Sequence, residues 1–467
     1  MWKILYKGAI INWRQLHRYQ RLHGLGGIGI IRISGERTFE IIKKIFKPLN
    51  PYEINEIKGY TMKFGYIIKD NKIVDEVLVS YFKSPKSYTT ENMCEINSHG
   101  GIIIMKQILA LCLENGANLA EPGEFTKRAF LNGRIDLSQA ESVIDIINAK
   151  SDLEAKEGIK QLEGFLSKKI RNIKKELLDL MTNIEVSIDY PEYDIPELDL
   201  EEYREKIAKI KRELVQLENS FDNGKIIREG IKTAIIGKPN AGKSSLLNAI
   251  LKEERAIVTE YEGTTRDTIE EFININGIPL KLIDTAGIRA TDNKIEKIGI
   301  EKTIKMAKNA DLIIIIIDSS KELDNDDLSI LNMVEPNKSI ILLNKIDLKS
   351  KIYEENEHFN EFKNIIRISA LKNEGIETLY KCIEEMYNCN KLILDNEILI
   401  TNQRHKNYIH LSVEELNKAE EKLNLNMPID IIEIYLQNIL KNLGAITGEE
   451  ASEEIINEIF SRFCLGK

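Results

Sequence analysis

Residues 237–244, which read GKPNAGKS, carry residue types at a spacing that suits phosphate binding. They fit the pattern G-x-x-x-x-G-K-[ST], in which glycines let backbone N–H groups turn toward phosphate oxygens. In such a loop Lys243 neutralises charge on the β- and γ-phosphates, and the hydroxyl of Ser244 ligates Mg²⁺. An apolar run at 232–237 predicts a strand before the loop, and residues 245–251 predict a helix after it. The sequence therefore predicts a nucleotide site at the N-terminus of a helix.

A second element, residues 344–347 (NKID), indicates which base is bound. It follows an apolar run at 340–343 and matches the N-K-x-D element of GTPases. The carboxylate of Asp347 can accept hydrogen bonds from the ring N–H and the exocyclic amine of guanine, a pair of donors that adenine lacks. An unpaired buried acceptor is costly, so we expect discrimination on the order of 10⁴. Residues 369–371 (SAL) add a further element beside the base.

Two more elements concern Mg²⁺ and the γ-phosphate. Residues 284–287 (DTAG) follow an apolar run, so that Asp284 holds Mg²⁺ through water and the N–H of Gly287 meets the γ-phosphate. Residues 263–267 (GTTRD) supply Thr265 as the switch threonine on Mg²⁺. Together the elements, in GTPase order, predict these GTP-binding residues: Asn240, Ala241, Gly242, Lys243, Ser244, Ser245, Thr264, Thr265, Asp284, Thr285, Ala286, Gly287, Asn344, Lys345, Asp347, Ser369, Ala370 and Leu371.

The residue that follows DTAG differs from that of Ras-like GTPases. There a glutamine orients the attacking water, whereas Ile288 is apolar. Another group must therefore orient the water, and the acidic candidates downstream are Asp292, Glu296 and Glu301. By residue type alone, each of these is better explained as a solvent-exposed charge on a helix.

The composition of the 467-residue chain limits what it can be. Its length predicts about two to four domains. Lys and Arg number 65 against 74 Asp and Glu, a net charge of −9, which argues against a broad nucleic-acid-binding surface. The five cysteines contain no C-x-x-C pair, so neither a disulfide framework nor a zinc site is predicted. The longest apolar run, 312–317, is shorter than the roughly 18 residues of a membrane helix, so we expect a buried strand and no membrane partner.

Periodicity predicts several domains. Residues 1–125 predict a small α+β domain with strands at 27–35, 61–68 and 74–82 and a helix at 102–113. Residues at helical spacing predict two long helices across 138–187 and further helices at 200–221, 403–423, 429–443 and 453–464. The predicted fold class is multidomain, α+β and α/β, in which a Ras-like P-loop G domain is inserted into a discontinuous helical domain. The predicted boundaries are 1–125 for the α+β domain, 126–228 and 388–467 for the helical domain, and 229–387 for the G domain.

Residues 263–267, 284–289 (DTAGIR) and 463–467 (FCLGK) together resemble the tRNA-modification GTPase family MnmE, also called TrmE. The resemblance covers nearly the whole chain. The further matching segments are 27–35, 87–89 with Glu95, 99–101, 122–126, 128–133, 136–141 and 447–449. Family members open with a short strand and a T-P-P-G-x-G-G loop, of which only the end, residues 24–27, is present after unrelated residues 1–23.

The resemblance implies a cytoplasmic homodimer that works with the flavoprotein MnmG, in a heterotetramer or larger complex, on tRNA. The pair adds an aminomethyl-type or carboxymethylaminomethyl-type group to carbon 5 of the wobble uridine, with a one-carbon unit from 5-formyl- or 5,10-methylenetetrahydrofolate. The family's N-terminal domain dimerises and binds folate, and its folate contacts fall on Arg32, Glu95, Arg134 and Lys467. Cations suit the glutamate tail of folate, and a carboxylate suits the paired N–H donors of the pterin. Where this chain has Arg134, the family usually has lysine, which keeps the charge but changes the donor geometry.

The resemblance also implies that GTP hydrolysis depends on K⁺ and on G domains that meet face to face. The positions that match the family's K⁺ site are Asn240, Thr259, Tyr261 and Thr264, and the resemblance places Thr259 among the GTP-binding residues as well. A K⁺ ion there would supply the charge that an arginine finger supplies elsewhere. Glu296 matches the family's catalytic glutamate, which orients the attacking water.

Cys464 has two interpretations. On a predicted helix at 453–464 it shares a stripe with Ile456 and Phe460, which is typical of a packed cysteine. The family's C-[IL]-G-K ending favours a role near the folate site instead, where the thiolate takes part in the modification chemistry. The pattern leaves both open.

Other functions share some of these motifs. A ribosome-assembly GTPase would have the same G-domain elements, but it is not expected to combine them with a folate-type N-terminal domain and a terminal C-x-G-K. A membrane-linked GTPase, such as an iron-transport G domain, would need a membrane span that the sequence does not show. A basic run at 168–175 fits tRNA phosphates or, more simply, the solvent-exposed side of a helix.

Overall fold

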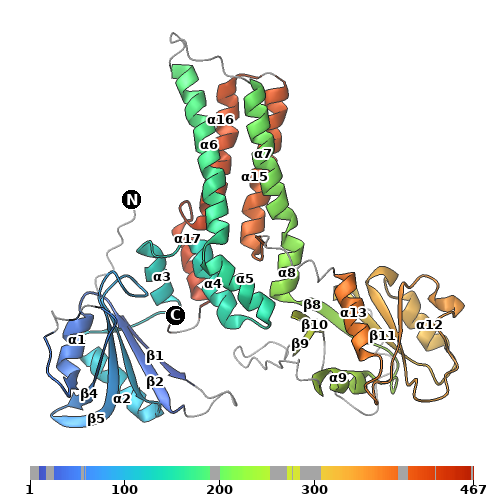
Figure 1. The fold of residues 1–467 in the computed structure, drawn as a ribbon, viewed down its shortest axis with the longest axis horizontal. Helices are drawn as coiled ribbons and strands as arrows, with labels where there is room; N and C mark the ends of the chain where they lie inside the picture. The colour runs from blue at the N-terminus through green and yellow to red at the C-terminus, as the bar shows by residue number, and fades with distance from the viewer. Residues whose placement is uncertain are drawn as a thin grey trace. The chain divides into compact units, whose positions relative to one another are not determined.

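The computed structural model describes residues 10–16, 26–53, 57, 59–189, 200–252, 271–275, 277–283, 307–387, 398–425, 427–463 and 466 (Figure 1). The chain divides into two compact units. Unit 1 comprises Met1–Ile144, Gln161–Asn172 and Leu440–Lys467, and unit 2 comprises Asp145–Lys160 and Ile173–Ile439. The long helix α6 (Phe165–Asp189) therefore contributes to both units.

Unit 1 contains a seven-stranded sheet with the order β3-β4-β5-β6-β2-β1-β7. Its strands are β1 (Ile10–Leu16), β2 (Ile28–Ser34), β3 (Phe46–Pro48), β4 (Thr61–Lys69), β5 (Lys72–Phe82), β6 (Met93–His99) and β7 (Asn118–Leu119). Strand β1 pairs antiparallel with β2, so residues 10–16, within the stretch that has no counterpart in the family pattern, form part of the sheet. The predicted strands near 27–35, 61–68 and 74–82 are all present.

One face of this sheet is covered by α1 (Thr38–Ile45) and α2 (Ile102–Glu114). Ile31 and Ile33 of β2 are fully buried in the core that these helices help to form. Because side chains alternate along a strand, Arg32 points to the opposite face. Its cross-strand partner in β6 is Glu95, which therefore lies on the same face.

Helices make up much of the remaining chain: α3 (Glu124–Leu131), α4 (Leu137–Asn148), α5 (Asp152–Leu162), α6, α7 (Leu200–Asn219), α8 (Phe221–Glu229), α15 (Gln403–Asn424), α16 (Ile429–Thr447) and α17 (Glu453–Ser461). The prediction of two long helices across 138–187 is wrong, because the structure has three there, α4, α5 and α6. Ser151 begins a new helix by accepting a hydrogen bond from the N–H of Glu154, and Gly164, with φ of +81°, interrupts the next. Helices α7 and α15 pack side by side, and Lys211 pairs with Glu420 between them.

Unit 2 also contains a six-stranded sheet with the order β13-β12-β11-β8-β10-β9. Its strands are β8 (Ile231–Ile236), β9 (Glu271–Ile275), β10 (Ile278–Leu282), β11 (Leu312–Asp318), β12 (Ser339–Asn344) and β13 (Asn364–Arg367). Helices α9 (Lys243–Lys252) and α13 (Ile376–Met386) pack on one face, and α12 (Asn325–Asn332) packs on the other. Short 3₁₀ turns occupy Pro336–Lys338 and Glu357–Phe359. All neighbouring strands are parallel except β9 and β10.

In the sheet, β8 lies between β11 and β10. The strands that follow β8 in the sequence therefore extend the sheet in both directions, and the strand order divides at the carboxyl end of β8. In open α/β sheets this is where ligands bind. Both faces of the sheet are covered, so β11 is buried along its whole length. Within the described ranges, no helix is long and apolar enough to cross a bilayer.

The first turn of α5 contains a buried carboxyl group. Glu154 is 6 % exposed, and its Oε2 accepts a hydrogen bond from the backbone N–H of Lys150 at 2.6 Å. Burial raises the pKa of Glu154 to about 7, although that hydrogen bond opposes the rise. Near neutral pH this carboxyl is therefore partly protonated.

This raised pKa predicts a pH-dependent stability. The folded state binds the proton more tightly than the unfolded state, so the contribution of Glu154 is fully present below pH 4.5 and is lost as pH rises through about 7. The shift corresponds to at most about 3 kcal/mol. We expect Glu154→Gln to raise the melting temperature relative to the wild type at about pH 8 but not at about pH 5. An equal difference between the two proteins at both pH values would contradict this account.

Candidate functional site

The predicted phosphate loop joins β8 to α9, at the edge of the sheet where the strand order divides. Gly237 has φ of +153° and Gly242 has φ of +109°, and a Cβ on Gly242 would overlap the Nδ2 atom of Asn344. Asn240 is also left-handed, with φ of +62°. Left-handed residues turn backbone N–H groups toward the concave side of a loop, so this geometry suits an anion.

The ammonium group of Lys243 lies inside this loop. Its Nζ donates hydrogen bonds to the carbonyl oxygens of Gly237 and Lys238, at 2.6 and 2.8 Å. Burial lowers the pKa of Lys243, because a charged ammonium is costly away from water. Phosphate oxygens would offset that cost better than neutral carbonyls do. Ser244 and Ser245 follow in the first turn of α9, at the positive end of the helix dipole.

Asn344 connects the phosphate loop to the predicted base-side loop at 369–371. Its side chain is 2 % exposed. Nδ2 donates to the carbonyl of Ala241 at 2.8 Å, and Oδ1 accepts from the N–H of Ala370 at 3.0 Å. One amide therefore joins two elements that are more than a hundred residues apart in the sequence.

Asp347 has a half-buried carboxylate beside the loop at 369–371. The hydroxyl of Ser369 donates to its Oδ1 at 2.7 Å, and this hydrogen bond lowers the pKa of Asp347. Lys345, with φ of +67°, turns its ammonium to Asp318 instead, at 2.7 Å. Leu371, in the same loop as Ser369, is 81 % exposed. An ionised, half-buried carboxylate held by a neighbour suits the donor pair of guanine.

The structure brings together the predicted residues at 240–245, 344–347 and 369–371. The other predicted nucleotide, magnesium, potassium and catalytic positions lie outside the described residues: Thr259, Tyr261, Thr264, Thr265, Asp284, Thr285, Ala286, Gly287 and Glu296. Of the predicted Mg²⁺ ligands the structure describes Ser244, and of the predicted K⁺ ligands it describes Asn240. Among the residues described, no three His, Cys, Asp or Glu side chains are grouped to hold a metal ion.

A pocket of about 620 Å³ opens in unit 1, on the sheet face opposite α1 and α2. Arg32 and Glu95 line it, and the Nε and Nη2 atoms of Arg32 lie 2.8 and 2.7 Å from Oε1 of Glu95. Arg134, which follows α3, lines the same pocket. Three of the four predicted folate residues, distant in sequence, are thus neighbours in space. Because Arg32 and Glu95 neutralise each other, Arg134 and the exposed Lys86 leave the pocket with excess positive charge.

Tyr88 and Ser87 are pocket residues whose individual chemistry the sequence did not predict. The guanidinium carbons of Arg32 and Arg134 lie 5.7 and 4.7 Å from the ring centroid of Tyr88. The hydroxyl of Ser87 is buried and has no hydrogen-bond partner in the structure. A buried hydroxyl without a partner is costly, so a polar ligand that bonds to it would be favoured. The motif at 87–89 was the only sequence signal for these residues.

A buried charge network holds the loop that carries these two residues. Arg128, whose side chain is 5 % exposed, pairs with Glu91 at 3.1 Å and with Glu124 at 2.8 Å. The hydroxyl of Ser34 donates to Glu91 at 2.7 Å. The network thereby connects the loop to β2 and to α3, and removal of one partner would leave a buried charge uncompensated.

The C-terminal segment also lies in unit 1. The carbonyl of Gly466 accepts a hydrogen bond from Nη1 of Arg32 at 3.3 Å, which places the residue before Lys467 at the pocket. The predicted helix at 453–464 is wrong at its end, because α17 stops at Ser461 and Arg462 caps it. Cys464 and Lys467 themselves lie outside the described residues.

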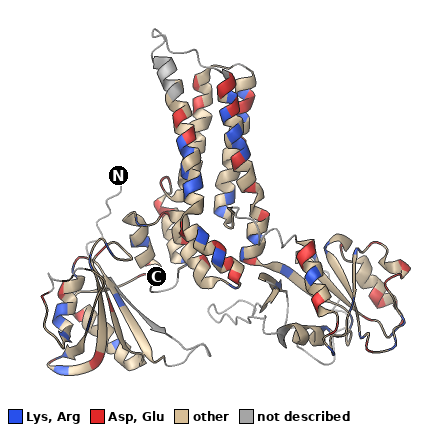
Figure 2. Ribbon diagram, in the orientation of Figure 1, with Lys and Arg blue, Asp and Glu red and all other residues tan. Residues whose placement is uncertain are grey.

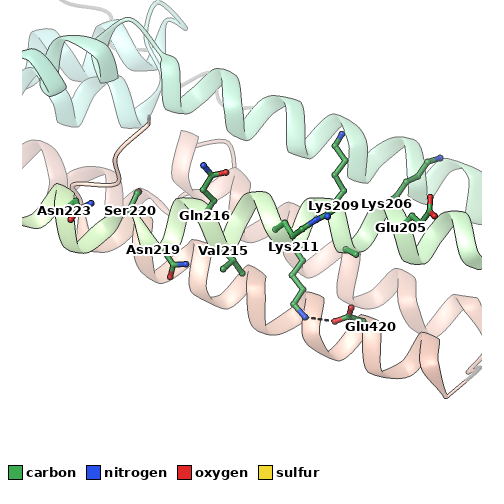
Figure 3. A pocket seen from close by; sticks show the side chains of 12 residues that line it. Glu205, Lys206, Lys209, Lys211, Val215, Gln216, Asn219, Ser220, Asn223 and Glu420 are labelled. Carbon is green, nitrogen blue, oxygen red and sulfur yellow. Dashed lines mark hydrogen bonds and ion pairs between the residues drawn. The ribbon is translucent and has the colours of Figure 1, made fainter. Parts of the chain in front are cut away.

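A groove of about 1100 Å³ runs along α7 in unit 2 (Figure 3). Lys209 and Lys211 line it, but they pair with Glu176 and Glu420, at 2.7 and 2.6 Å. Acidic and basic residues are interspersed along α7 (Figure 2). Mixed, paired charges of this kind are typical of a solvent-exposed helix surface.

The fold and the loop set define a multidomain protein in which a Ras-like P-loop GTPase domain accompanies a helical domain and an N-terminal α+β domain. A family model described as "MnmE helical domain" matches residues 137–464, and one described as "GTP-binding protein TrmE N-terminus" matches residues 21–134. The chain belongs to the family of tRNA modification GTPases MnmE. It is accordingly a GTP hydrolase of tRNA modification.

Curated relatives named "tRNA modification GTPase MnmE" match nearly the whole chain. The protein of Acetivibrio thermocellus is 50 % identical over 448 residues, and that of Clostridioides difficile is 48 % identical over 445. Each match covers 95 % of this chain and 97 % of the relative. Among solved structures, the G domain of the T. maritima FeoB iron transporter is 28 % identical and covers 33 % of this chain and 98 % of that chain. Its TM-score of 0.25 supports no statement about the fold.

The two hydrogen bonds of Asn344 predict a stability effect. Asn344→Ala leaves the carbonyl of Ala241 and the N–H of Ala370 without this partner, so we expect a loss of about 2–4 kcal/mol and a lower melting temperature. Asn332→Ala, at the exposed end of α12, is the matched control and should change stability by less than about 0.5 kcal/mol. Melting temperatures that are equal for wild type and Asn344→Ala would show that the amide is not a structural connection.

Proposed function

We propose that this protein is a K⁺-dependent GTPase that acts in the cytoplasm as a homodimer with the flavoprotein MnmG, in a heterotetramer or larger complex. The pair would add an aminomethyl-type or carboxymethylaminomethyl-type group to carbon 5 of the tRNA wobble uridine, with a one-carbon unit from 5-formyl- or 5,10-methylenetetrahydrofolate. The observation that carries this proposal is the pocket that unites Arg32, Glu95 and Arg134 in a chain that also has a GTPase domain. The domain boundaries at 125, 228 and 387 remain predictions.

The residues of the unit 1 pocket fit a folate. The carboxylate of Glu95 is an acceptor for the paired N–H donors of a pterin, and the exposed guanidinium of Arg134 is a donor for the carboxylates of the glutamate tail. The ring of Tyr88 offers a flat surface for stacking. When bound, the folate supplies the one-carbon unit. The residues of the chain bind and orient it, and in the proposal Lys467 and Cys464 complete the site.

In the GTPase site, each predicted residue has a distinct role. Ser244 and Thr265 would ligate Mg²⁺, and Asn240, Thr259, Tyr261 and Thr264 would hold K⁺ between G domains that meet face to face. Glu296 would orient the attacking water, because Ile288 cannot do so. The support for this arrangement is the anion-suited loop around Lys243 and the guanine-suited carboxylate of Asp347.

Exchange of K⁺ for Na⁺ tests the hydrolysis mechanism. We expect turnover to fall by about tenfold or more in Na⁺, because the charge that K⁺ supplies near the phosphates is lost. Glu296→Ala should abolish hydrolysis while the affinity for GTP stays within about threefold. The control is Glu301→Ala, at another acidic candidate. Equal rates in both salts, or a large loss of GTP affinity in Glu296→Ala, would refute these roles.

Calorimetry with 5-formyltetrahydrofolate tests the pocket. Arg134→Ala should weaken binding by about 10- to 100-fold, because a charge-assisted hydrogen bond is lost, and Glu95→Gln should weaken it similarly. Arg37→Ala, in the same unit but outside the pocket, should bind like the wild type. Neither pocket substitution should change GTP turnover of the isolated protein. If the wild-type protein does not bind the folate, the one-carbon part of the proposal fails and the GTPase part stands.

A further inference from the structure

The β9–β10 hairpin connects two stretches of the predicted nucleotide site. Thr265 lies six positions before Glu271, where β9 begins, and Asp284 lies two positions after Leu282, where β10 ends. A paired hairpin moves as a unit, since each strand is held in register by the other. The position of the hairpin therefore sets where the chain enters β9, after the first stretch, and where it leaves β10, before the second.

The turn of this hairpin packs against α5, within unit 2 (Figure 1). Gly277 forms the turn with φ of +96°, and a Cβ added to it would lie 3.0 Å from Cδ1 of Leu153. Leu153 also packs against the core cluster that includes Ile275 and Ile278 of the hairpin. Close-packed groups have no free space between them, so the hairpin turn cannot move toward α5 without moving Leu153.

Strand β9 makes a second contact with the same region, the corner between α4 and α5 (residues 145–153). The Nζ atom of Lys150, two residues before α5, lies 3.9 Å from the ring centroid of Phe272. Phe272 is 4 % exposed, so its ring has a fixed environment. The negative face of an aromatic ring attracts the cation, and the attraction is stronger where water is excluded. Lys150 therefore helps to hold β9 laterally.

Helix α8 holds the hairpin through β10. Ile226 packs on the same core cluster, and a Cβ on Gly230 would lie 2.6 Å from the carbonyl oxygen of Pro279. Nη2 of Arg228 in α8 pairs with Oδ1 of Asp145 in α4 at 2.8 Å. The end of α4, the start of α5 and α8 are thus connected to one another and to the hairpin.

From these contacts we infer that Lys150 and Leu153 are positioning residues for GTP hydrolysis. They hold the β9–β10 hairpin, which the sequence places between Thr265 and Asp284. Through the same contacts, a displacement of the hairpin that depends on the bound nucleotide is passed to α5 and α8. The same packed contacts act in both directions, so a change at Lys150 or Leu153 displaces the hairpin and a displacement of the hairpin disturbs Lys150 and Leu153. The inference rests on the proposed roles of Thr265 and Asp284 and not on K⁺ or folate.

Steady-state GTP hydrolysis by the full-length protein tests the positioning role of Lys150 and Leu153. Leu153→Ala should lower kcat by about tenfold with KM within about twofold, because small misplacements of distant groups reduce turnover while the loops that bind GTP are untouched. Lys150→Met removes the charge at the edge of the contact and should lower kcat by about threefold. The matched controls on the outer side of α5, Ile159→Ala and Lys156→Met, should match the wild type. Unchanged kcat in both test variants would overturn the inference, even if Leu153→Ala alone lost stability.

Hydrogen–deuterium exchange tests whether the bound nucleotide affects α5 through the hairpin. A purely structural role of Lys150 would not make this exchange depend on the nucleotide. In the wild type, exchange of the amides at 150–158 should differ between GDP and a non-hydrolysable GTP analogue, and in Lys150→Met this difference should shrink. Identical exchange in the two nucleotides would overturn the inference. Asp284→Ala in the hydrolysis assay separates it from the proposed function. If that variant loses turnover while the two corner variants do not, this inference alone fails, whereas full turnover in Asp284→Ala refutes both.

Discussion

The nucleotide site depends on one buried carboxamide. The phosphate loop and the base-side loop lie at the ends of different strands, and loops have no ladder of backbone hydrogen bonds to align them. Asn344 supplies the missing connection, because its donor reaches Ala241 and its acceptor reaches Ala370. An amide in this position cannot be replaced by a smaller or an apolar side chain without leaving buried backbone groups unpaired. The distance between the phosphate end and the base end of the site is thereby set.

The pocket of unit 1 is built differently, on a sheet that uses its two faces for two purposes. Ile31 and Ile33 point into the core, and the alternation of the strand leaves Arg32 beside Glu95 on the other face. Charged residues can line this face because the loop and helix that close the pocket are held by the buried pairs of Arg128. The stability of the unit and the chemistry of the pocket thus come from the same strands.

The hairpin β9–β10 relates the GTPase domain to the helices that surround it. Within unit 2, its turn packs on Leu153, its first strand contacts Lys150, and its second strand contacts Gly230, the residue after α8. These contacts consist of apolar packing, one cation–π pair and one ion pair. The packing is close enough to transmit small displacements, and the contacts are few enough that the hairpin can shift relative to the helices. Through these contacts, the positions of α5 and α8 can depend on which nucleotide is bound.

The sequence by itself determined the local elements of this protein: the strand, glycine loop and helix around Lys243, the buried strand β11, and the strands β2, β4 and β5 of the N-terminal sheet. These depend on periodicity and backbone preferences over a few residues, which a sequence states directly. Where the signal was a single cap or a left-handed glycine, as at Ser151 and Gly164, periodicity missed the break between helices. Only the tertiary structure decided that Arg32 lies on Glu95 and that Lys150 lies over Phe272, more than a hundred residues away. Such pairs depend on strand register and on packing between distant segments, and no local pattern specifies either.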